Sequence, residues 1–170
     1  MILYSHQIFE KLSFLLHVFE RKNPYREARL RQIENISVDA IIFGLGRYGD
    51  NIAKSLERIG KVVMGVDFDP QAVLRWKQQG RFAQQGDADD PDLHELLPLQ
   101  NTKVIISTVP DFEINLYLVK LLRLRGYKGR IALTHHQSGN SQKLLDSGAD
   151  LILYPYEDAA EDISHKLNCF

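Results

Sequence analysis

Three glycines and one acidic residue are spaced in this chain as in sites that bind adenosine phosphates. Gly44, Gly46 and Gly49 form a Gly-x-Gly-x-x-Gly turn directly after the mainly apolar stretch 38–43. A second apolar stretch ends at Asp67, 18 residues after the last glycine. Such a turn brings phosphate oxygens to backbone N–H groups, and a carboxylate placed there accepts hydrogen bonds from ribose hydroxyls. These residues predict a dinucleotide-binding or nucleotide-binding site.

Each residue of the turn has an expected role. Gly44 permits the tight bend, Gly46 lets a pyrophosphate approach the backbone, and Gly49 lets the following helix pack closely on the strand. The N-terminus of that helix carries partial positive charge. Arg47 stands at this end and is placed to contact a phosphate oxygen, with Tyr48 beside it in the candidate site. A plain strand-to-helix turn with a solvated arginine is the alternative.

Asp67 indicates which nucleotides fit. Its carboxylate would repel a 2′-phosphate, and no arginine follows in Phe68 and Asp69 to accept one. NAD(H), AMP, ADP or ATP is therefore favoured over NADP, and Phe68 is included in the candidate site. The sequence does not distinguish among these ligands, because all of them carry the adenosine ribose.

An acidic loop, residues 86–90, follows the third expected strand. Asp87 and Ala88 are expected to border the adenine pocket, whereas Asp89 or Asp90 would cap the next helix. A cation site is the alternative, since hard cations prefer oxygen ligands. Ribose binding and helix capping already account for most of these acids, and we expect no metal.

Hydroxyl and imidazole groups follow the next two expected strands. Ser107 and Thr108 end the fourth strand, at the switch point where open α/β sheets bind ligands. They are candidates for the pyrophosphate or nicotinamide-ribose region, or simply strand-end hydroxyls. His135 and His136 follow the fifth strand and are interpreted as loop residues.

No catalytic constellation accompanies the predicted pocket. The chain has no tyrosine followed four positions later by lysine, no nucleophile elbow and no HExxH helix. We therefore expect a binding domain and not an enzyme. A fragment of an NAD-dependent oxidoreductase and a nucleotide-free assembly module remain the alternatives.

Six short apolar runs alternate with helical patterns and supply the elements that position these residues. Most of them are continuous β-branched or aliphatic runs, as is typical of parallel strands covered on both faces. The fold class is therefore α/β, a doubly wound sheet of six parallel strands. Asp69-Pro70 and Asp90-Pro91 each predict a helix start. The expected strands are 39–43, 61–66, 81–85, 103–107, 130–134 and 150–153.

The segment before the sheet, residues 1–37, is expected to form a short amphipathic helix and a charged linker. Ile8, Leu12, Leu15 and Phe19 recur at helical spacing, and five basic residues lie between positions 20 and 31. The helix packs on the domain or lies just inside a membrane, where basic residues favour anionic headgroups. The domain itself is expected over 38–170.

Composition and charge limit the partners and the kind of protein that the chain can be. A net charge of -1 argues against nucleic acid as a partner. The single cysteine, Cys169, excludes an intrachain disulfide, and no apolar run approaches the length of a membrane span. A cytoplasmic location follows as the default expectation.

The expected helix 112–125 is unusually apolar, with nine apolar residues among its 14. Helices that cover one face of a sheet need only an apolar stripe, so the surplus predicts a further partner. We expect a homodimer that uses this helix.

Five stretches together resemble the RCK domain, also called TrkA-N, a family of cytoplasmic nucleotide-binding regulators of potassium channels and cation transporters. The stretches are 39–49, 65–70, 86–88, 106–108 and 145–155. Residues 4–27 resemble the segment that joins the last membrane helix to this domain in Kef-like cation:proton antiporters.

The resemblance implies a Rossmann-like dimer that binds NAD(H) or an adenine nucleotide and conveys its ligand state to a membrane-embedded transporter or channel of monovalent cations. That partner would belong to the same polypeptide if the chain is part of a longer protein. The segment 156–170 would cross over or extend the dimer contact. The transported ion and the sign of regulation are not given by the sequence.

Overall fold

A central sheet of six parallel strands organises the chain in a computed structural model, which describes residues 37–136 and 139–167. The strand order is β3-β2-β1-β4-β5-β6. This is the expected doubly wound arrangement, and every strand begins and ends within two residues of its expected range. The strands are β1 (Ala40–Phe43), β2 (Val63–Asp67), β3 (Phe82–Gln85), β4 (Val104–Ser107), β5 (Arg130–Thr134) and β6 (Leu151–Leu153).

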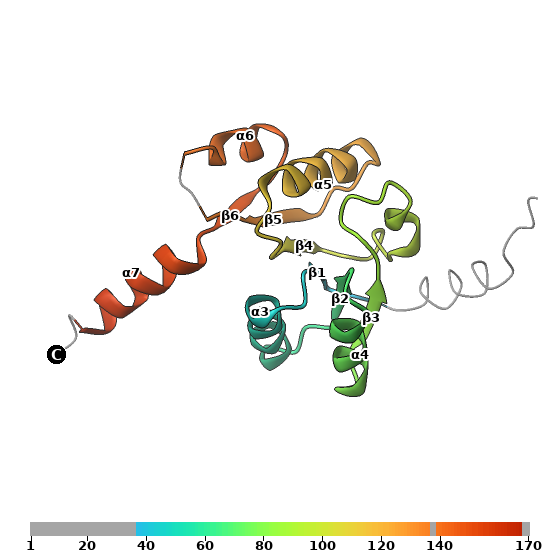
Figure 1. Cartoon of the computed structure of the whole chain (residues 1–170), viewed down its shortest axis with the longest axis horizontal. Helices are drawn as coiled ribbons and strands as arrows, with labels where there is room; N and C mark the ends of the chain where they lie inside the picture. The colour runs from blue at the N-terminus through green and yellow to red at the C-terminus, as the bar shows by residue number, and fades with distance from the viewer. Residues whose placement is uncertain (1–36, 137–138, 168–170) are drawn as a thin grey trace, which may run out of the picture. The chain divides into compact units, whose positions relative to one another are not determined.

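Helices cover both faces of this sheet, which explains the uninterrupted apolar strands. In Figure 1, α3 (Arg47–Arg58) and α4 (Pro70–Gln78) lie on one side, and α5 (Phe112–Leu124) and α6 (Ser141–Asp146) lie on the other. Each face has its own apolar core. Trp76 of α4 packs in the first, and Leu122 of α5 packs in the second. All four residues of β1, at the centre, are buried.

One of the two expected helix starts is correct. The Asp69 carboxylate caps α4 by accepting a hydrogen bond of 2.9 Å from the Gln71 N–H group. The Asp90-Pro91 prediction is wrong as an α-helix start. There, the Asp90 carboxylate accepts from the Asp92 N–H group and closes a turn, which leads into the 3₁₀ helix η1 (Leu93–Leu96) of four residues.

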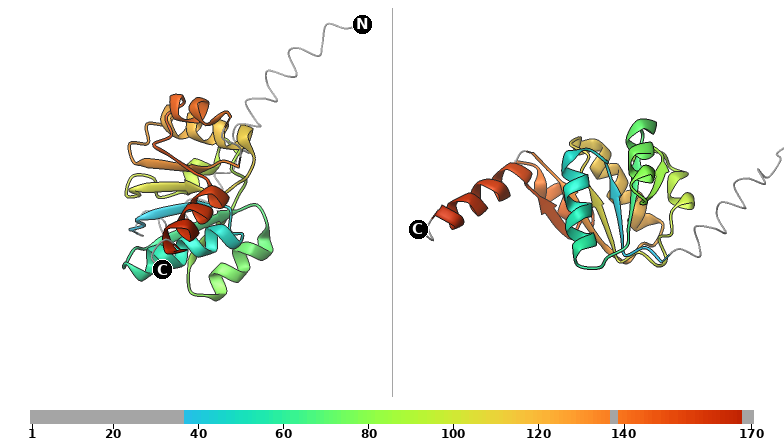
Figure 2. Two further views of the ribbon diagram at one scale, coloured as in Figure 1. Left: turned by 90° about the vertical axis from the view of Figure 1, so that its left-hand side faces the viewer. Right: turned by 90° about the horizontal axis from the view of Figure 1, so that it is seen from below.

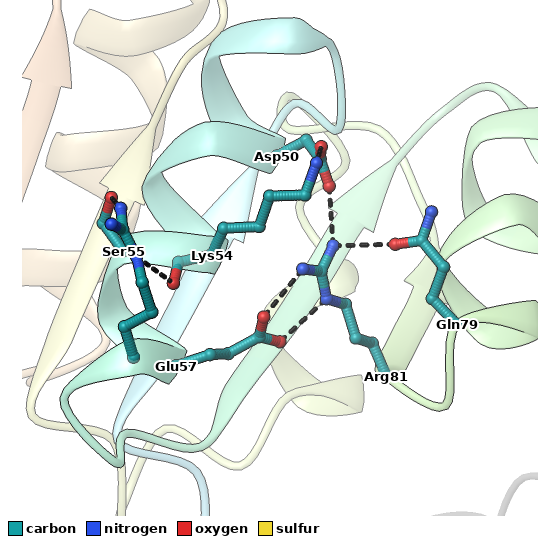
Figure 3. A network of polar contacts seen from close by, with 7 residues as sticks. Asp50, Lys54, Ser55, Glu57, Gln79 and Arg81 are labelled. Carbon is teal, nitrogen blue, oxygen red and sulfur yellow. Dashed lines mark hydrogen bonds and ion pairs between the residues drawn. The ribbon is translucent and has the colours of Figure 1, made fainter.

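An ion-pair network ties α3 to the edge of the sheet (Figure 3). Arg81, just before β3, donates two hydrogen bonds of 2.7 Å to the Glu57 carboxylate and one of 2.6 Å to Asp50. The guanidinium also lies over the Trp76 ring, 4.9 Å from its centroid. Since the Arg81 side chain is only 10% exposed, these contacts are shielded from water and fix the position of α3.

The predicted surplus of apolar residues on α5 is largely absorbed by its own core. Leu116, Leu118, Val119 and Leu122 are buried. Only Tyr117 and Leu124 on this helix are exposed large apolar residues, and they carry what remains of the sequence argument for self-association.

The helix α7 (Pro155–Leu167) buries none of its residues. Figures 1 and 2 show it extending away from the sheet after β6. Its apolar residues recur at helical spacing and form one stripe, whose exposed members are Tyr156, Ile163 and Leu167. The family resemblance implied that the segment 156–170 crosses over or extends a dimer contact, but this apolar stripe was not predicted from the residues.

The expected N-terminal helix and charged linker lie outside the described residues and stay predictions. Within the part of the chain that the structure describes, no helix combines the length and apolarity needed to cross a bilayer.

Candidate functional site

A cavity of about 890 Å³ opens at the carboxyl ends of the strands. It lies over β1 and β4, the neighbouring strands from which the chain winds in opposite directions. This is the switch point where ligands bind in open α/β sheets. Its wall includes nine of the residues expected to bind a nucleotide: Gly44, Gly46, Arg47, Tyr48, Asp67, Phe68, Asp87, Ala88 and Thr108. Gly49 and Ser107 lie outside the wall.

The glycine turn has the geometry that each of its glycines was expected to permit. Gly44 has φ +89°, a left-handed conformation that other residues rarely adopt. A Cβ on Gly49 would lie 2.1 Å from the Gly44 carbonyl oxygen, so α3 packs against the turn without room for a methyl group. A Cβ on Gly46 would meet nothing within 4 Å. Gly46 therefore faces open cavity, where a ligand can contact its backbone.

The N-terminus of α3 supplies hydrogen-bond donors to the same space. The first intrahelical bond runs from the Asp50 N–H group to the Gly46 carbonyl oxygen, at 2.9 Å. The N–H groups of the preceding turn have no partner four residues back. No side chain caps this end of the helix. Arg47 is the one lysine or arginine in the cavity wall formed by the described residues. This end of the cavity suits phosphate groups.

Asp67 holds the glycine turn in place as well as facing the cavity. One of its carboxylate oxygens accepts a 2.6 Å hydrogen bond from the Leu45 N–H group, and the other accepts a 2.8 Å bond from the Asp69 N–H group. A carboxylate has about four acceptor sites, so two remain for ribose hydroxyls. This link between the turn and the start of α4 was not predicted from the sequence.

Ser107 and Thr108 have different surroundings. The Thr108 hydroxyl donates to the carbonyl oxygen of Gly44 at 2.8 Å and lies in the cavity wall. Ser107 is fully buried, and its hydroxyl accepts a 3.3 Å bond from the Val109 N–H group. Ser107 thus supports the loop after β4 from behind, as a strand-end hydroxyl would.

The part of the cavity that would hold the adenosine of a nucleotide, here called the adenosine half, ends at Phe68 and the loop after β3. Phe68 is 71% exposed at the cavity wall, where its ring offers an apolar face to a base. Asp87 and Ala88 line the same cavity. Among the described residues, no three His, Cys, Asp or Glu side chains come together to hold a metal ion.

A second half of the cavity extends under β5 and the start of α7. Its wall is mainly apolar and includes Val109, Pro110, Ile114, Thr134, His136, Pro155, Tyr156 and Ala159. The His136 and Tyr156 rings lie 5.5 Å apart between centroids. His136, interpreted from the sequence as a loop residue, thus belongs to the wall, whereas His135 is buried at 6% exposure and does not.

Tyr48 lies where α3 approaches α7. Partial burial raises the pKa of its phenol, and the Asp158 carboxylate on α7 raises that pKa further. Asp158 also accepts a 3.1 Å bond from the Tyr154 N–H group, at the start of α7. A ligand beside Tyr48 therefore lies close to the first turns of the unpartnered helix.

Comparison with known proteins identifies relatives of this chain. The model of the TrkA-N domain family matches residues 40–155. The chain is 29% identical over 127 residues to the Ktr system potassium uptake protein C of Bacillus subtilis, covering 74% of this chain and 57% of that protein. It is 26% identical over 112 residues to the glutathione-regulated potassium-efflux system protein KefC of Escherichia fergusonii, covering 66% of this chain and 18% of that protein. The chain thus spans only part of both curated relatives.

Solved structures share the fold. The NAD(P)-binding domain of an exopolyphosphatase-related protein from Archaeoglobus fulgidus superposes with a TM-score of 0.72 at 20% identity, over 78% of this chain and 99% of that one. The Kef CTD of Shewanella denitrificans in its AMP-bound form has a TM-score of 0.62 at 20% identity, over 73% and 75% of the two chains. The GsuK channel bound to NAD has a TM-score of 0.63 at 19% identity, over 71% and 22%.

Proposed function

Because this chain belongs to the TrkA-N domain family, we propose that it is a regulatory domain that binds an adenine nucleotide and conveys the state of that site to a membrane protein transporting potassium or another monovalent cation. NAD(H) is the favoured ligand, with AMP, ADP or ATP as the other candidates. The domain acts at the cytoplasmic face of the membrane. Its nucleotide is a signal and not a reagent.

The observation that carries this proposal is the open space in front of Gly46. A backbone with room for a phosphate, a helix N-terminus, Arg47 and the Asp67 carboxylate all border one cavity. Phosphate oxygens would accept from the N–H groups of the first turn of α3 and from Arg47. Ribose hydroxyls would donate to Asp67, and the adenine would lie near Phe68 and Ala88.

The similar proteins support the transport part of the proposal. The relatives named above are a potassium uptake protein and a potassium-efflux protein. The structural neighbours include a channel bound to NAD and a Kef domain bound to AMP. A membrane-embedded cation transporter or channel is therefore the proposed partner, within the same polypeptide or as a separate subunit.

A homodimer is the proposed assembly. The apolar stripe of α7 is exposed, and Tyr117 and Leu124 add exposed apolar surface on α5. Burial of an exposed apolar helix face against another surface lowers the free energy, and a second copy of the chain offers the same faces.

Coupling to transport requires that the ligand bind one conformation more tightly than another. The cavity wall joins the glycine turn to the first turns of α7 through Tyr48, Tyr156 and Ala159. A ligand that contacts both sides stabilises one position of α7 relative to α3. The unpartnered helix then transmits that position to the second subunit.

Thermal unfolding of the 170-residue chain with each nucleotide tests the proposal. A ligand at 100 times its Kd adds about 2.7 kcal/mol to the free energy of unfolding, and about 1 kcal/mol raises Tm by roughly 2 to 4 °C at this size. We expect an increase of about 5 to 11 °C with at least one adenine nucleotide and none with GTP. Failure of every adenine nucleotide to raise Tm would favour the nucleotide-free assembly module.

An oxidoreductase fragment remains the alternative function. His136 and Tyr156 line the second half of the cavity, where a hydride acceptor would lie. Incubation of the chain with NADH and candidate carbonyl substrates, followed at 340 nm, separates the two functions. The regulatory proposal expects no sustained loss of absorbance, whereas continued turnover would contradict it.

A further inference from the structure

The edge of the sheet where the strands begin carries a cluster of exposed cations. Two segments lie at this edge: residues 58–62, from the end of α3 to the start of β2, and residues 124–130, from the end of α5 to the start of β5. The first segment contains two lysine or arginine residues and the second contains three, and neither contains an acidic residue. All five cations are exposed. These two segments are called the basic edge below.

Hydrogen bonds hold the two segments in one row. The Asp39 carboxylate, at the start of β1, accepts a 3.1 Å bond from the Val62 N–H group and a 3.0 Å bond from the Lys103 ammonium group. Both bonds lower the pKa of Asp39, and the charge of Lys61 lowers it further. The Lys103 carbonyl oxygen in turn accepts a 2.9 Å bond from the Arg130 N–H group. The row therefore follows the strand order β2-β1-β4-β5 and keeps the cations together.

The carboxylates beside the basic edge do not neutralise it, because three of them pair with cations outside the two segments. These ion pairs are Asp39 with Lys103, Glu57 with Arg81 and Asp150 with Arg123. Among the described residues, the five cations of the basic edge form no ion pair of their own. Their charge is therefore available to an anionic partner.

Exposed aliphatic side chains accompany the cations in both segments. Ile59 is 69% exposed and Val62 is 40% exposed in the first segment, and Leu124 is 83% exposed in the second. A nucleic acid would pair with the cations and leave these side chains in water. An anionic bilayer suits both kinds of residue, because its phosphates pair with lysine and arginine while aliphatic groups enter the boundary of the acyl chains.

The opposite edge of the sheet, where the strands end, is acidic. Residues 86–92 include four exposed aspartates, and Asp111 and Glu113 add two exposed carboxylates at the start of α5. An anionic surface attracts the basic edge and repels this acidic one. Since the cavity opens at the carboxyl ends of the strands, a chain held by its basic edge presents the cavity to the aqueous side.

We propose that the basic edge binds the surface of an anionic lipid bilayer. Lys61 and Lys128 contact lipid phosphates, and Ile59 and Leu124 lie at the boundary between headgroups and acyl chains. The inference goes beyond the nucleotide site and does not depend on it. It adds a lipid contact to the transporter partner of the proposed function, and this contact directs the cavity mouth away from the bilayer.

Co-sedimentation of the 170-residue chain with lipid vesicles tests the inference. One set of vesicles is phosphatidylcholine alone, and the other contains about 30% phosphatidylglycerol, which is anionic. The test variant is K61Q/K128Q, which removes two charges from the basic edge. The matched control is K143Q/K166Q, which removes two exposed lysines from α6 and α7.

We expect the wild-type chain to bind the anionic vesicles and not those of phosphatidylcholine alone. K61Q/K128Q should lower the affinity about 10- to 30-fold, because each lysine beside an anionic surface contributes about fivefold. K143Q/K166Q should bind as the wild type does. Raising NaCl from about 0.1 to 0.5 M should release the chain. The Tm increase caused by NADH should be the same in wild type and K61Q/K128Q, since the cavity lies at the opposite edge.

A tryptophan at position 59 reports the contact directly. I59W replaces an exposed side chain at the end of α3 and leaves every cation in place, whereas the native Trp76 is buried and gives a constant background. Anionic vesicles should shift the emission of I59W to shorter wavelength, and brominated lipid should quench it. I163W, at an exposed position of α7, is the control and should show neither effect.

Three results would overturn the inference: equal binding to both kinds of vesicle, equal affinity of K61Q/K128Q and K143Q/K166Q, and unchanged I59W emission on vesicles that bind the chain. The I59W measurement decides the matter if K61Q/K128Q does not fold. Tighter binding of single-stranded RNA than of anionic vesicles at the same salt would assign the basic edge to nucleic acid instead. Vesicle binding by a chain whose Tm no adenine nucleotide raises would support this inference and refute the proposed function.

Discussion

Replacing Gly46 with alanine separates ligand binding from folding. A Cβ at this position meets nothing within 4 Å, and the backbone has φ -70°, which alanine adopts without strain. Gly46 precedes the first residue of α3, where alanine is a poorer cap than glycine, so we expect a cost of about 0.5 to 1 kcal/mol. At this chain length the Tm of the free protein should fall by less than about 4 °C.

The same methyl group stands in the space that a bound phosphate needs. Contact between the phosphate and the backbone at 46 is lost or lengthened, and we expect the Kd for NADH or AMP to rise about 10- to 100-fold, equivalent to roughly 1.4 to 2.8 kcal/mol. Isothermal titration calorimetry on wild type and G46A measures this change, with the Tm of each free protein recorded in parallel.

Gly49 provides the matched control for this variant. A Cβ there lies 2.1 Å from the Gly44 carbonyl oxygen, so G49A forces α3 away from the turn. Overpacking of this kind costs about 1 to 3 kcal/mol, which lowers Tm by about 2 to 12 °C. If G46A bound nucleotides as tightly as wild type, or if its loss of binding came with a Tm as low as that of G49A, the assignment of Gly46 to the phosphate site would be refuted.

Three further outcomes are expected. D67N should weaken every adenosine ligand and also lower Tm, because the carboxylate accepts from the N–H groups of Leu45 and Asp69; unchanged binding by calorimetry would contradict its ribose role. Hydrogen bonds from Lys54 and Arg81 lower the pKa of Asp50 in the folded chain. The unfolded chain therefore binds a proton at Asp50 before the folded chain does as pH falls below about 4, and the free energy of unfolding declines there. D50N should make the Tm, measured by thermal melts, depend less on pH between about pH 5 and 3. Burial raises the pKa of Tyr127 to about 12, so stability is retained below pH 10 and lost as pH rises from 10 to 12; a phenolate absorbance titrating near 10 in the folded chain would be inconsistent with this burial.

The sequence predicts the sheet well because local signals and long-range structure agree. Most strands are short, mainly aliphatic runs, and parallel strands buried on both faces need that composition, whereas β3 at the edge of the sheet reads Phe-Ala-Gln-Gln. Asp69-Pro70 forms its helix start because the residues after it have a partner surface, through Trp76 in the core. Asp90-Pro91 carries the same local signal, but only four residues continue it as η1 before Pro98, so the chain closes a turn there.

The candidate site is predicted only where a spacing motif marks it. The glycine turn and Asp67 have fixed sequence distances, whereas the second half of the cavity comes from residues far apart in the chain. Asn115 is one polar residue in an apolar helix, and nothing local indicates that its amide fixes Val109 and Thr134. The rule that ligands bind at strand ends would have identified Thr134, the last residue of β5.

The exposed face of α7 was not predicted from its residues for a similar reason, although the family resemblance implied that the segment 156–170 extends a dimer contact. Its apolar stripe has the spacing of a helix that packs on its own sheet. Only the fold reveals that β6 is an edge strand and that α7 extends beyond it. Exposure of this kind depends on topology, which periodicity alone does not report.

Amide hydrogen exchange of the chain, with and without saturating NADH, tests the central claim most directly. If the nucleotide binds at the glycine turn, the N–H groups of residues 47–49, which begin α3 without intrahelical partners, should become protected together with the segment 67–69. Protection should be absent in G46A at the same ligand concentration. Binding of NADH that leaves 44–49 unprotected, or protection confined to another face of the sheet, would contradict the account.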